Sequence, residues 1–291
     1  MNSKKHTSSS LRTLLKERRG RSAMVVYFVL RILVLAVMLR QFFNGNFENF
    51  FLCILTLFLF TLPSFIERKL AVDLPDTLEI IILLFIFAAE ILGEISAYYI
   101  TFPYWDTMLH TLNGFLCAAI GFSLVDLLNR HDRFTFRLSP LFMALVAFCF
   151  SMTIGVLWEF FECGMDQLFQ LDMQKDTIVQ TISSVMLDPN HGNTPTGLSD
   201  IADVIVVTAD GQQHALGLGG YLDIGILDTM KDLFVNFIGA IVFSLIGFFY
   251  VKSRGNGKFA RRFIPQVLDL PDSPEEVPVE EAAVSSASKK E

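Results

Sequence analysis

Acidic residues and one histidine recur at helical spacing inside stretches of the sequence that are otherwise apolar. Asp106 and His110 lie four residues apart in YWDTMLHTLNG, and Glu159 and Glu162 lie three apart in WEFFECGMD. Residues three or four apart share one face of an α-helix, so each pair presents its polar groups together. Carboxylates grouped with an imidazole suit a divalent cation, and Zn²⁺, Mn²⁺ and Mg²⁺ all match that ligand set.

Other apolar stretches carry polar residues with the same spacing. The further members are Glu90, Glu94, Asp166, Asp228, Asp232 and Asn236. Ionisable residues in a membrane-spanning segment are energetically costly, and by default they mark functional sites. The chemistry therefore depends on whether these stretches cross a membrane.

The composition is that of a membrane protein. The chain has 291 residues, of which 52% are hydrophobic and only 18% are charged, and its mean hydropathy is +0.48. This composition excludes a disordered chain, a collagen-like chain and a small disulfide scaffold. A membrane span needs about 20 mainly apolar residues. Six stretches satisfy this length: residues 23–43, 47–66, 79–99, 107–128, 141–163 and 228–251.

The distribution of Lys and Arg predicts the topology. With a cytoplasmic N-terminus, nineteen of the 23 basic residues fall on the inner side and only Lys175 falls in an outer segment. This asymmetry predicts six spans with both termini inside. The chain then divides into a basic N-terminus (1–22), a transmembrane domain (23–251) and a basic, then acidic, disordered tail (252–291). The basic residues lie beside span ends, so nothing indicates nucleic-acid binding.

One long outer segment, residues 164–227, separates the last two predicted spans. We expect a short amphipathic helix after Asp176, with Ile178, Ile182 and Val185 on one face. DVIVVT and QQHAL flank an Asp-Gly pair and predict a β-hairpin. The predicted fold is therefore an all-α membrane bundle with a small outer module.

Four of the spans place their acids at similar depth near the outer side, so these faces should meet. Several neighbouring carboxylates cannot all ionise without compensation. A metal ion, protonation, or pairing with Arg40 and Lys231 would supply it, and a purely structural ion-paired network is the alternative. For a metal site the predicted ligands are Asp106, His110, Glu162, Asp228 and Asp232. Glu159 or Glu162 would act as the catalytic general base.

Three motifs carry a resemblance to a known family. YWDTMLHTLNGF, WEFFE and LDTMKDLFVNFIGA resemble the signature of YjdF-type bacterial inner membrane proteins, and more distantly that of the VanZ-like group. The resemblance implies a bacterial plasma membrane location and a polar site at Asp106, His110, Glu159, Glu162, Asp228 and Asp232. It supplies no reaction, although the VanZ-like group is associated with resistance to the glycopeptide teicoplanin.

Three functions remain open from the sequence. The first is a metal-dependent hydrolase that acts on an envelope lipid or a membrane peptide. The second is a transporter or cation-binding carrier. The third is a non-catalytic envelope protein that binds a partner through its outer segment.

Overall fold

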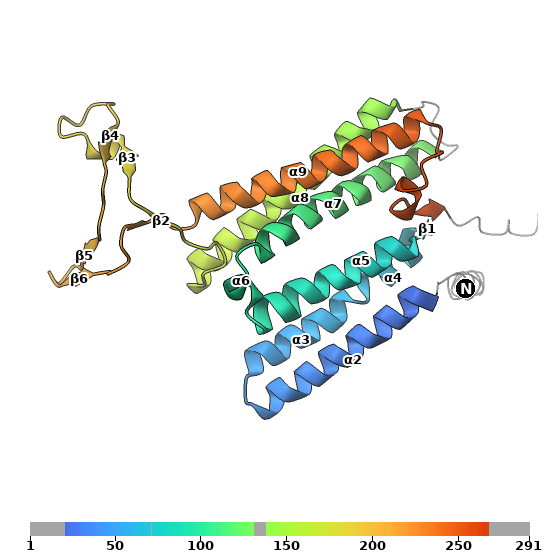
Figure 1. The fold of residues 1–291 in the computed structure, drawn as a ribbon, viewed down its shortest axis with the longest axis horizontal. Coiled ribbons are helices and arrows are strands. Elements are labelled where there is room, and N and C mark those ends of the chain that lie inside the picture. The colour runs from blue at the N-terminus through green and yellow to red at the C-terminus, as the bar shows by residue number, and fades with distance from the viewer. Residues whose placement is uncertain (1–20, 71, 131–137, 268–291) are drawn as a thin grey trace, which may run out of the picture.

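The computed structural model describes residues 21–70, 72–130 and 138–267. Long helices run side by side along a common direction and reverse at each loop (Figure 1). The segment 170–225, which we call the arm, projects from one end of the bundle (the arm end). The first described helix begins, and the last one ends, at the opposite end (the tail end). Among the described residues, five helices are long and apolar enough to cross a membrane.

The N-terminal group of helices forms one side of the bundle. Its members are α2 (Arg21–Phe43), α3 (Phe47–Leu59), α4 (Leu62–Leu70), α5 (Asp76–Phe87) and η1 (Ala88–Ile95). The Asn46 side chain caps α3 by accepting a hydrogen bond from the backbone N–H of Asn49. The second predicted span comprises α3 and α4, which are separated by a short break before Pro63. Pro63 falls in the first turn of α4, where its missing N–H costs no hydrogen bond.

The third predicted span, unlike the second, is not among the five long helices. Helix α5 (Asp76–Phe87) begins three residues before the predicted span, and the next eight residues, Ala88–Ile95, form the π-helix η1. π-Helices are rare in proteins, and those that occur are often found at functional sites. The Trp105 indole N–H donates to the carbonyl oxygen of Ala88 at this junction (3.3 Å). After η1, Ala97 has a left-handed backbone (φ 57°), and the short α6 (Tyr98–Thr101) leads into the next span.

The C-terminal group packs much more tightly. It consists of α7 (Trp105–Arg130), α8 (Pro140–Phe169) and α9 (Ile226–Lys252). At Gly114 a Cβ atom would lie 2.1 Å from the backbone oxygen of Asn236, and at Gly239 it would lie 2.1 Å from that of Thr111. Helices α7 and α9 therefore approach backbone to backbone, as small residues allow in membrane bundles. This contact fixes the register between the polar faces of the two helices.

The arm contains strands where the sequence suggested a helix. Its elements are β2 (Ile178–Val179), β3 (Ile182–Ser184), η2 (Val185–Leu187), β4 (Thr196–Leu198), β5 (Ile205–Val207), β6 (Gln213–Ala215) and β7 (Tyr221–Leu222). The predicted amphipathic helix is wrong, because Ile178 and Ile182 pair in two separate antiparallel ladders, with Leu222 and Leu198. The predicted hairpin is confirmed, with Val206 opposite His214. Isoleucine favours strands as well as apolar helix faces, so its spacing alone misled the prediction.

The beginning of the predicted disordered tail is ordered. Residues after α9 fold back through η3 (Ala260–Arg262), and β8 (Gln266–Val267) pairs with β1 (Val72–Asp73). Phe263 and Ile264 are buried in the core beside Phe243. The prediction for 252–267 is corrected, because these apolar side chains close the tail end of the bundle. Residues 268–291 lie outside the described part.

Candidate functional site

His110 is the centre of a cluster that joins three helices at the arm end. Its Nε2 atom lies 3.3 Å from Asp106 Oδ1 and 3.9 Å from Asp232 Oδ2. Its Nδ1 atom faces a different acid, at 3.8 Å from Glu159 Oε1. Helix α7 supplies His110 and Asp106, α8 supplies Glu159 and α9 supplies Asp232. The two ring nitrogens thus have two separate sets of carboxylate neighbours.

These neighbours form two groups with the spacing of metal ligands. Asp106, His110 and Asp232 are one group, and His110, Glu159 and Glu162 are the other. Within each group one donor atom per residue lies within 4.8 Å of the others. Asp232 is only 1% exposed and Glu159 only 4%. The sequence prediction that these stripes face one another therefore agrees with the geometry.

Lys231 neutralises only one of the two groups. Its Nζ atom lies 2.5 Å from Asp228 Oδ1, 3.5 Å from Asp106 Oδ2 and 3.6 Å from Asp232 Oδ1. No Lys or Arg contact is present at Glu159 or Glu162 among the described residues. Five carboxylates therefore surround one lysine and one histidine. Even with both of these charged, three negative charges are left without a partner.

Several buried oxygens in the cluster have no hydrogen bond. Across the described residues this holds for Asp106 Oδ2, Asp232 Oδ1 and Glu159 Oε2. The two aspartate oxygens have the longer contacts with Lys231, whereas Glu159 Oε2 has no such contact. A buried polar group without a partner costs about 1–3 kcal/mol, and a charged one costs more. The arrangement therefore calls for a further positive partner, either a proton or a metal ion.

The two glutamates of α8 differ in their remaining contacts. The Trp158 indole N–H donates to Glu162 Oε1 (2.8 Å). The spacing of four residues between Trp158 and Glu162, which puts them on one helix face, is the sequence signal for this contact. Glu162 is thus oriented by a neighbour on its own helix, while Glu159 Oε2 stays unpartnered.

Two predicted site residues have structural contacts instead. Asp166 accepts hydrogen bonds from the backbone N–H groups of Met173 (2.7 Å) and Gln174 (2.9 Å). Asp228 accepts from the Lys175 N–H through Oδ2 (3.0 Å) and contacts Lys231 through Oδ1. Neither aspartate belongs to a ligand group. Asp228 was a predicted metal ligand, but both of its oxygens are occupied where the arm joins the bundle.

Asn236 lies one turn deeper than Asp232 and forms the floor of the cluster. Its Oδ1 accepts a hydrogen bond from Asn113 Nδ2 (3.3 Å), and its Nδ2 lies 3.6 Å from Met152 Sδ. Asn113 was not among the predicted site residues. The signal was available, because Asn113 follows His110 by three residues on the same face of α7.

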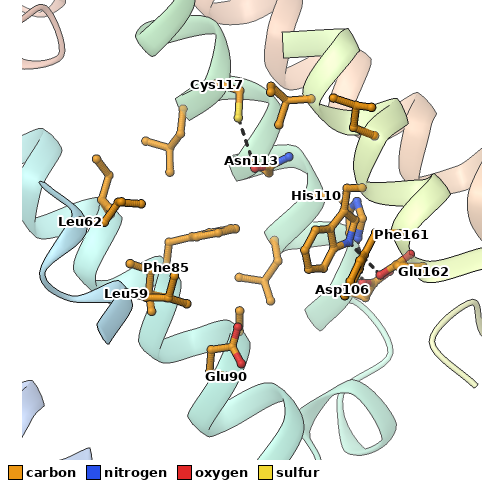
Figure 2. A pocket seen from close by; sticks show the side chains of 18 of the residues that line it. Leu59, Leu62, Phe85, Glu90, Asp106, His110, Asn113, Cys117, Phe161 and Glu162 are labelled. Atoms are coloured by element: carbon orange, nitrogen blue, oxygen red, sulfur yellow. Dashed lines mark hydrogen bonds and ion pairs between the residues drawn. The ribbon is translucent and has the colours of Figure 1, made fainter. Parts of the chain in front are cut away.

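Glu90 and Glu94 lie across a cavity from the cluster, on the π-helix η1. Figure 2 shows Glu90 on the wall opposite Asp106, His110 and Glu162. The cavity, of about 1540 Å³, is lined by both helix groups and includes all five of these residues. The structure thus brings Glu90 and Glu94 to the same space as His110 but not into its ligand groups.

Fold and site together define a polytopic helical membrane protein with a buried His/carboxylate cluster. A family profile described as a predicted membrane protein, DUF2238, matches residues 25–253. The chain belongs to this family, of which YjdF is a member. Neither the curated proteins nor the solved structures gave a match. The resemblance to YjdF-type proteins is therefore confirmed at the level of the family, and the likeness to the VanZ-like group stays a prediction.

Proposed function

We propose that this protein is an intramembrane metal-dependent hydrolase that acts on an envelope lipid. The observation that carries the proposal is the unequal neutralisation of the two carboxylate groups around His110. Lys231 contacts the acids on the Nε2 side, whereas the acids on the Nδ1 side have no cation among the described residues. A divalent ion would supply the missing charge there.

The proposed ligands are His110 Nδ1, Glu159 and Glu162. Asp106 and Asp232 would then act from the other side of the ring, because they lie where they can accept the Nε2 proton. Carboxylates in this position fix the tautomer and orientation of a ligating histidine. The sequence-based ligand set is thereby reassigned: Glu159 replaces Asp228, and the two remaining aspartates orient the histidine.

The catalytic roles follow from the remaining contacts. A divalent ion in such a site supplies a Lewis acid and activates water for attack. Glu159 would bind the ion through Oε1, which faces His110 Nδ1, and act as the base through Oε2, which has no hydrogen bond, whereas Glu162 already accepts from Trp158. In the hydrolysis the water oxygen bonds to the phosphorus or carbonyl carbon and the bond to the leaving oxygen breaks. The proton taken by Glu159 passes to that leaving oxygen.

The location follows from the same proposal. The arm holds a single lysine, Lys175, and no arginine, whereas most of the basic residues in the described part of the chain lie at the tail end. The positive-inside rule then places the arm outside a bacterial plasma membrane, with both termini in the cytoplasm. The site would open near the outer leaflet.

The experiment uses purified full-length protein and a total lipid extract of bacterial envelopes. We expect mass spectrometry to show new lipid products that disappear after treatment with a chelator and in Glu159→Gln. Leu128→Trp, at an exposed position of α7 outside the cavity, serves as the control and should stay active. Products that persist without metal, or in Glu159→Gln, contradict the proposal, as does an unchanged extract.

A cation carrier is the second candidate, because the cavity also contains Ser123 and Asp126 near the tail end. Polar groups at both ends are a requirement for passage. The lining between them is mainly apolar, which disfavours an ion path. Uptake of Mn²⁺ or Zn²⁺ by proteoliposomes that is lost in Asp126→Asn would favour the carrier over the hydrolase.

A further inference from the structure

The cavity beside the cluster separates the two groups of helices along most of the bundle. Figure 1 shows α5 and α7 facing one another, each belonging to a different group. Helices α3, α4, α5 and η1 line one wall, and α7 and α8 line the other. At about 1540 Å³ the cavity exceeds the roughly 300–1,000 Å³ of pockets for drug-sized ligands. It is large enough for a lipid molecule.

The lining changes from polar to apolar with depth. The arm end has Glu90, Asp106 and His110, and Asn113 follows one turn deeper on α7, whereas the turns beyond it present Leu116 and Ile120. Ile120 lies about 15 Å along α7 from His110, which is about half the thickness of a hydrocarbon core. The opposite wall is apolar at the same depth, with Leu55, Ile82 and Phe85. A polar mouth above a long apolar channel matches the shape of a lipid.

The chemistry of the surroundings selects the occupant. A buried water molecule needs two to four polar partners, so water does not stably fill an apolar channel of this kind. In a membrane the adjacent molecules are lipids, and their chains match the channel in both polarity and length. The N-terminal group of helices contacts the C-terminal group only sparsely, through α5 and η1, whereas α7, α8 and α9 pack closely on one another. The boundary between the groups therefore provides a route from the bilayer.

The charges at the mouth select the headgroup. Two lysines line the cavity there, Lys175 and Lys231, with side chains 49% and 44% exposed. Lys231 also contacts Asp106, which contacts His110, so a phosphate beside Lys231 would lie next to the proposed metal site. Without the metal, the carboxylates around His110 would repel a phosphate, so the headgroup assignment depends on the ion.

We propose that the cavity binds the hydrocarbon chain of a phosphate-bearing bilayer lipid and places the phosphate at the His110 cluster. This inference rests on the proposed function, because it names the substrate class of the same site. The hydrocarbon chain of the lipid is held by the apolar walls that both helix groups contribute. The headgroup is held by the divalent ion together with Lys231.

The test fills the channel from either wall. Ile82→Trp on α5 and Ile120→Trp on α7 place a large side chain in the channel. Leu84→Trp and Leu128→Trp are the matched controls, since both lie on the same helices at exposed positions outside the cavity lining. The use of two walls keeps the test valid when one filled variant fails to fold.

The readout is lipid retained by detergent-purified protein in native mass spectrometry. The probes are phosphatidylglycerol and diacylglycerol with identical chains. We expect wild type and both controls to retain phosphatidylglycerol, the filled variants to retain about tenfold less, and diacylglycerol to be retained weakly. Equal retention in the filled variants overturns the channel assignment, and equal retention of the two lipids overturns the phosphate assignment.

Metal content and lipid retention, both measured on the wild-type protein, separate this inference from the proposed function. Metal bound by wild type together with no lipid retention overturns only the lipid inference. Lipid retention that is lost on channel filling, in a wild-type protein without metal, overturns the hydrolase and leaves the channel standing.

Discussion

Two sets of carboxylates lie at the arm end of the bundle, and they differ in what their oxygens contact. At the base of the arm, Asp166 and Asp223 accept backbone N–H groups through both oxygens. Around His110, by contrast, Glu159 and Asp232 are more deeply buried and each has an oxygen without a hydrogen bond. Satisfied carboxylates hold a local structure, whereas unsatisfied ones need a partner from outside the chain.

The largest effect should come from neutralising the unsatisfied set. Glu159→Gln and Glu162→Gln each remove a negative charge and one proposed ligand oxygen, so we expect each to abolish stoichiometric binding of a divalent ion. Competition with a chelating dye measures the affinity. Asp166→Asn is the matched control at the base of the arm, and an equal loss in that variant would erase the distinction between the two sets.

A smaller effect is expected from the residues that orient the histidine. Asp106→Asn removes the charge beside His110 Nε2 but leaves the Nδ1 ligand in place. Loss of such an orienting partner typically lowers metal affinity about 10- to 100-fold. The same dye competition measures it. Complete loss would place the ion on the Asp106 side of the ring.

The third prediction concerns Asp166, a carboxylate at the base of the arm whose two oxygens both accept hydrogen bonds. Asp166→Ala removes the acceptor of two backbone N–H groups, at a cost of about 1–3 kcal/mol per unsatisfied group. We expect faster hydrogen exchange at Met173 and Gln174, measured by mass spectrometry, with unchanged metal content. Asp172→Ala is the control, because its exposed contact with Lys175 is worth little. A loss of metal in Asp166→Ala would contradict the separation of the two regions.

The smallest effect is a pH dependence at the base of the arm. Burial alone would raise the pKa of Asp223, but hydrogen bonds from the backbone N–H groups of Thr177 and Leu227 hold this pKa below its usual value. A lowered pKa in the folded state stabilises the protein above the unfolded pKa of about 3.9, and this contribution disappears as the pH falls through the lowered value. Cleavage of the arm by an acid protease should therefore increase below pH ~4.

The Asp223→Ala variant is the control for this pH dependence. It lacks the titrating group, so its arm should be cleaved at a similar rate across the same acidic range. A wild-type arm with the same flat profile would contradict a contribution from Asp223.

The helical spacing of the acids was enough to predict which faces meet. The pairs Asp106 with His110 and Glu159 with Glu162 do lie on shared faces, because the α-helical period fixes relative direction along each span. The spacing did not show which acids are already satisfied. Asp228 and Asp232 look equivalent in the sequence, but Asp228 is held by Lys231 and by the backbone N–H of Lys175, whereas Asp232 lies beside His110.

Other features depend on contacts between distant segments. The π-helix η1 is tied to the Trp105 indole, seventeen residues further along the chain, and no local pattern marks it. The cavity exists because the two helix groups pack closely within themselves and sparsely against each other. The ordered part of the tail depends on Phe263 packing against Phe115 and Phe243. Local periodicity carries none of this information.

The most direct test of the central claim is elemental analysis of the purified full-length protein beside its His110→Ala variant. We predict about one divalent ion per wild-type chain and none in the variant, because His110 supplies the only nitrogen ligand of the proposed set. A wild-type protein without metal, or a variant that keeps the ion, would contradict the account.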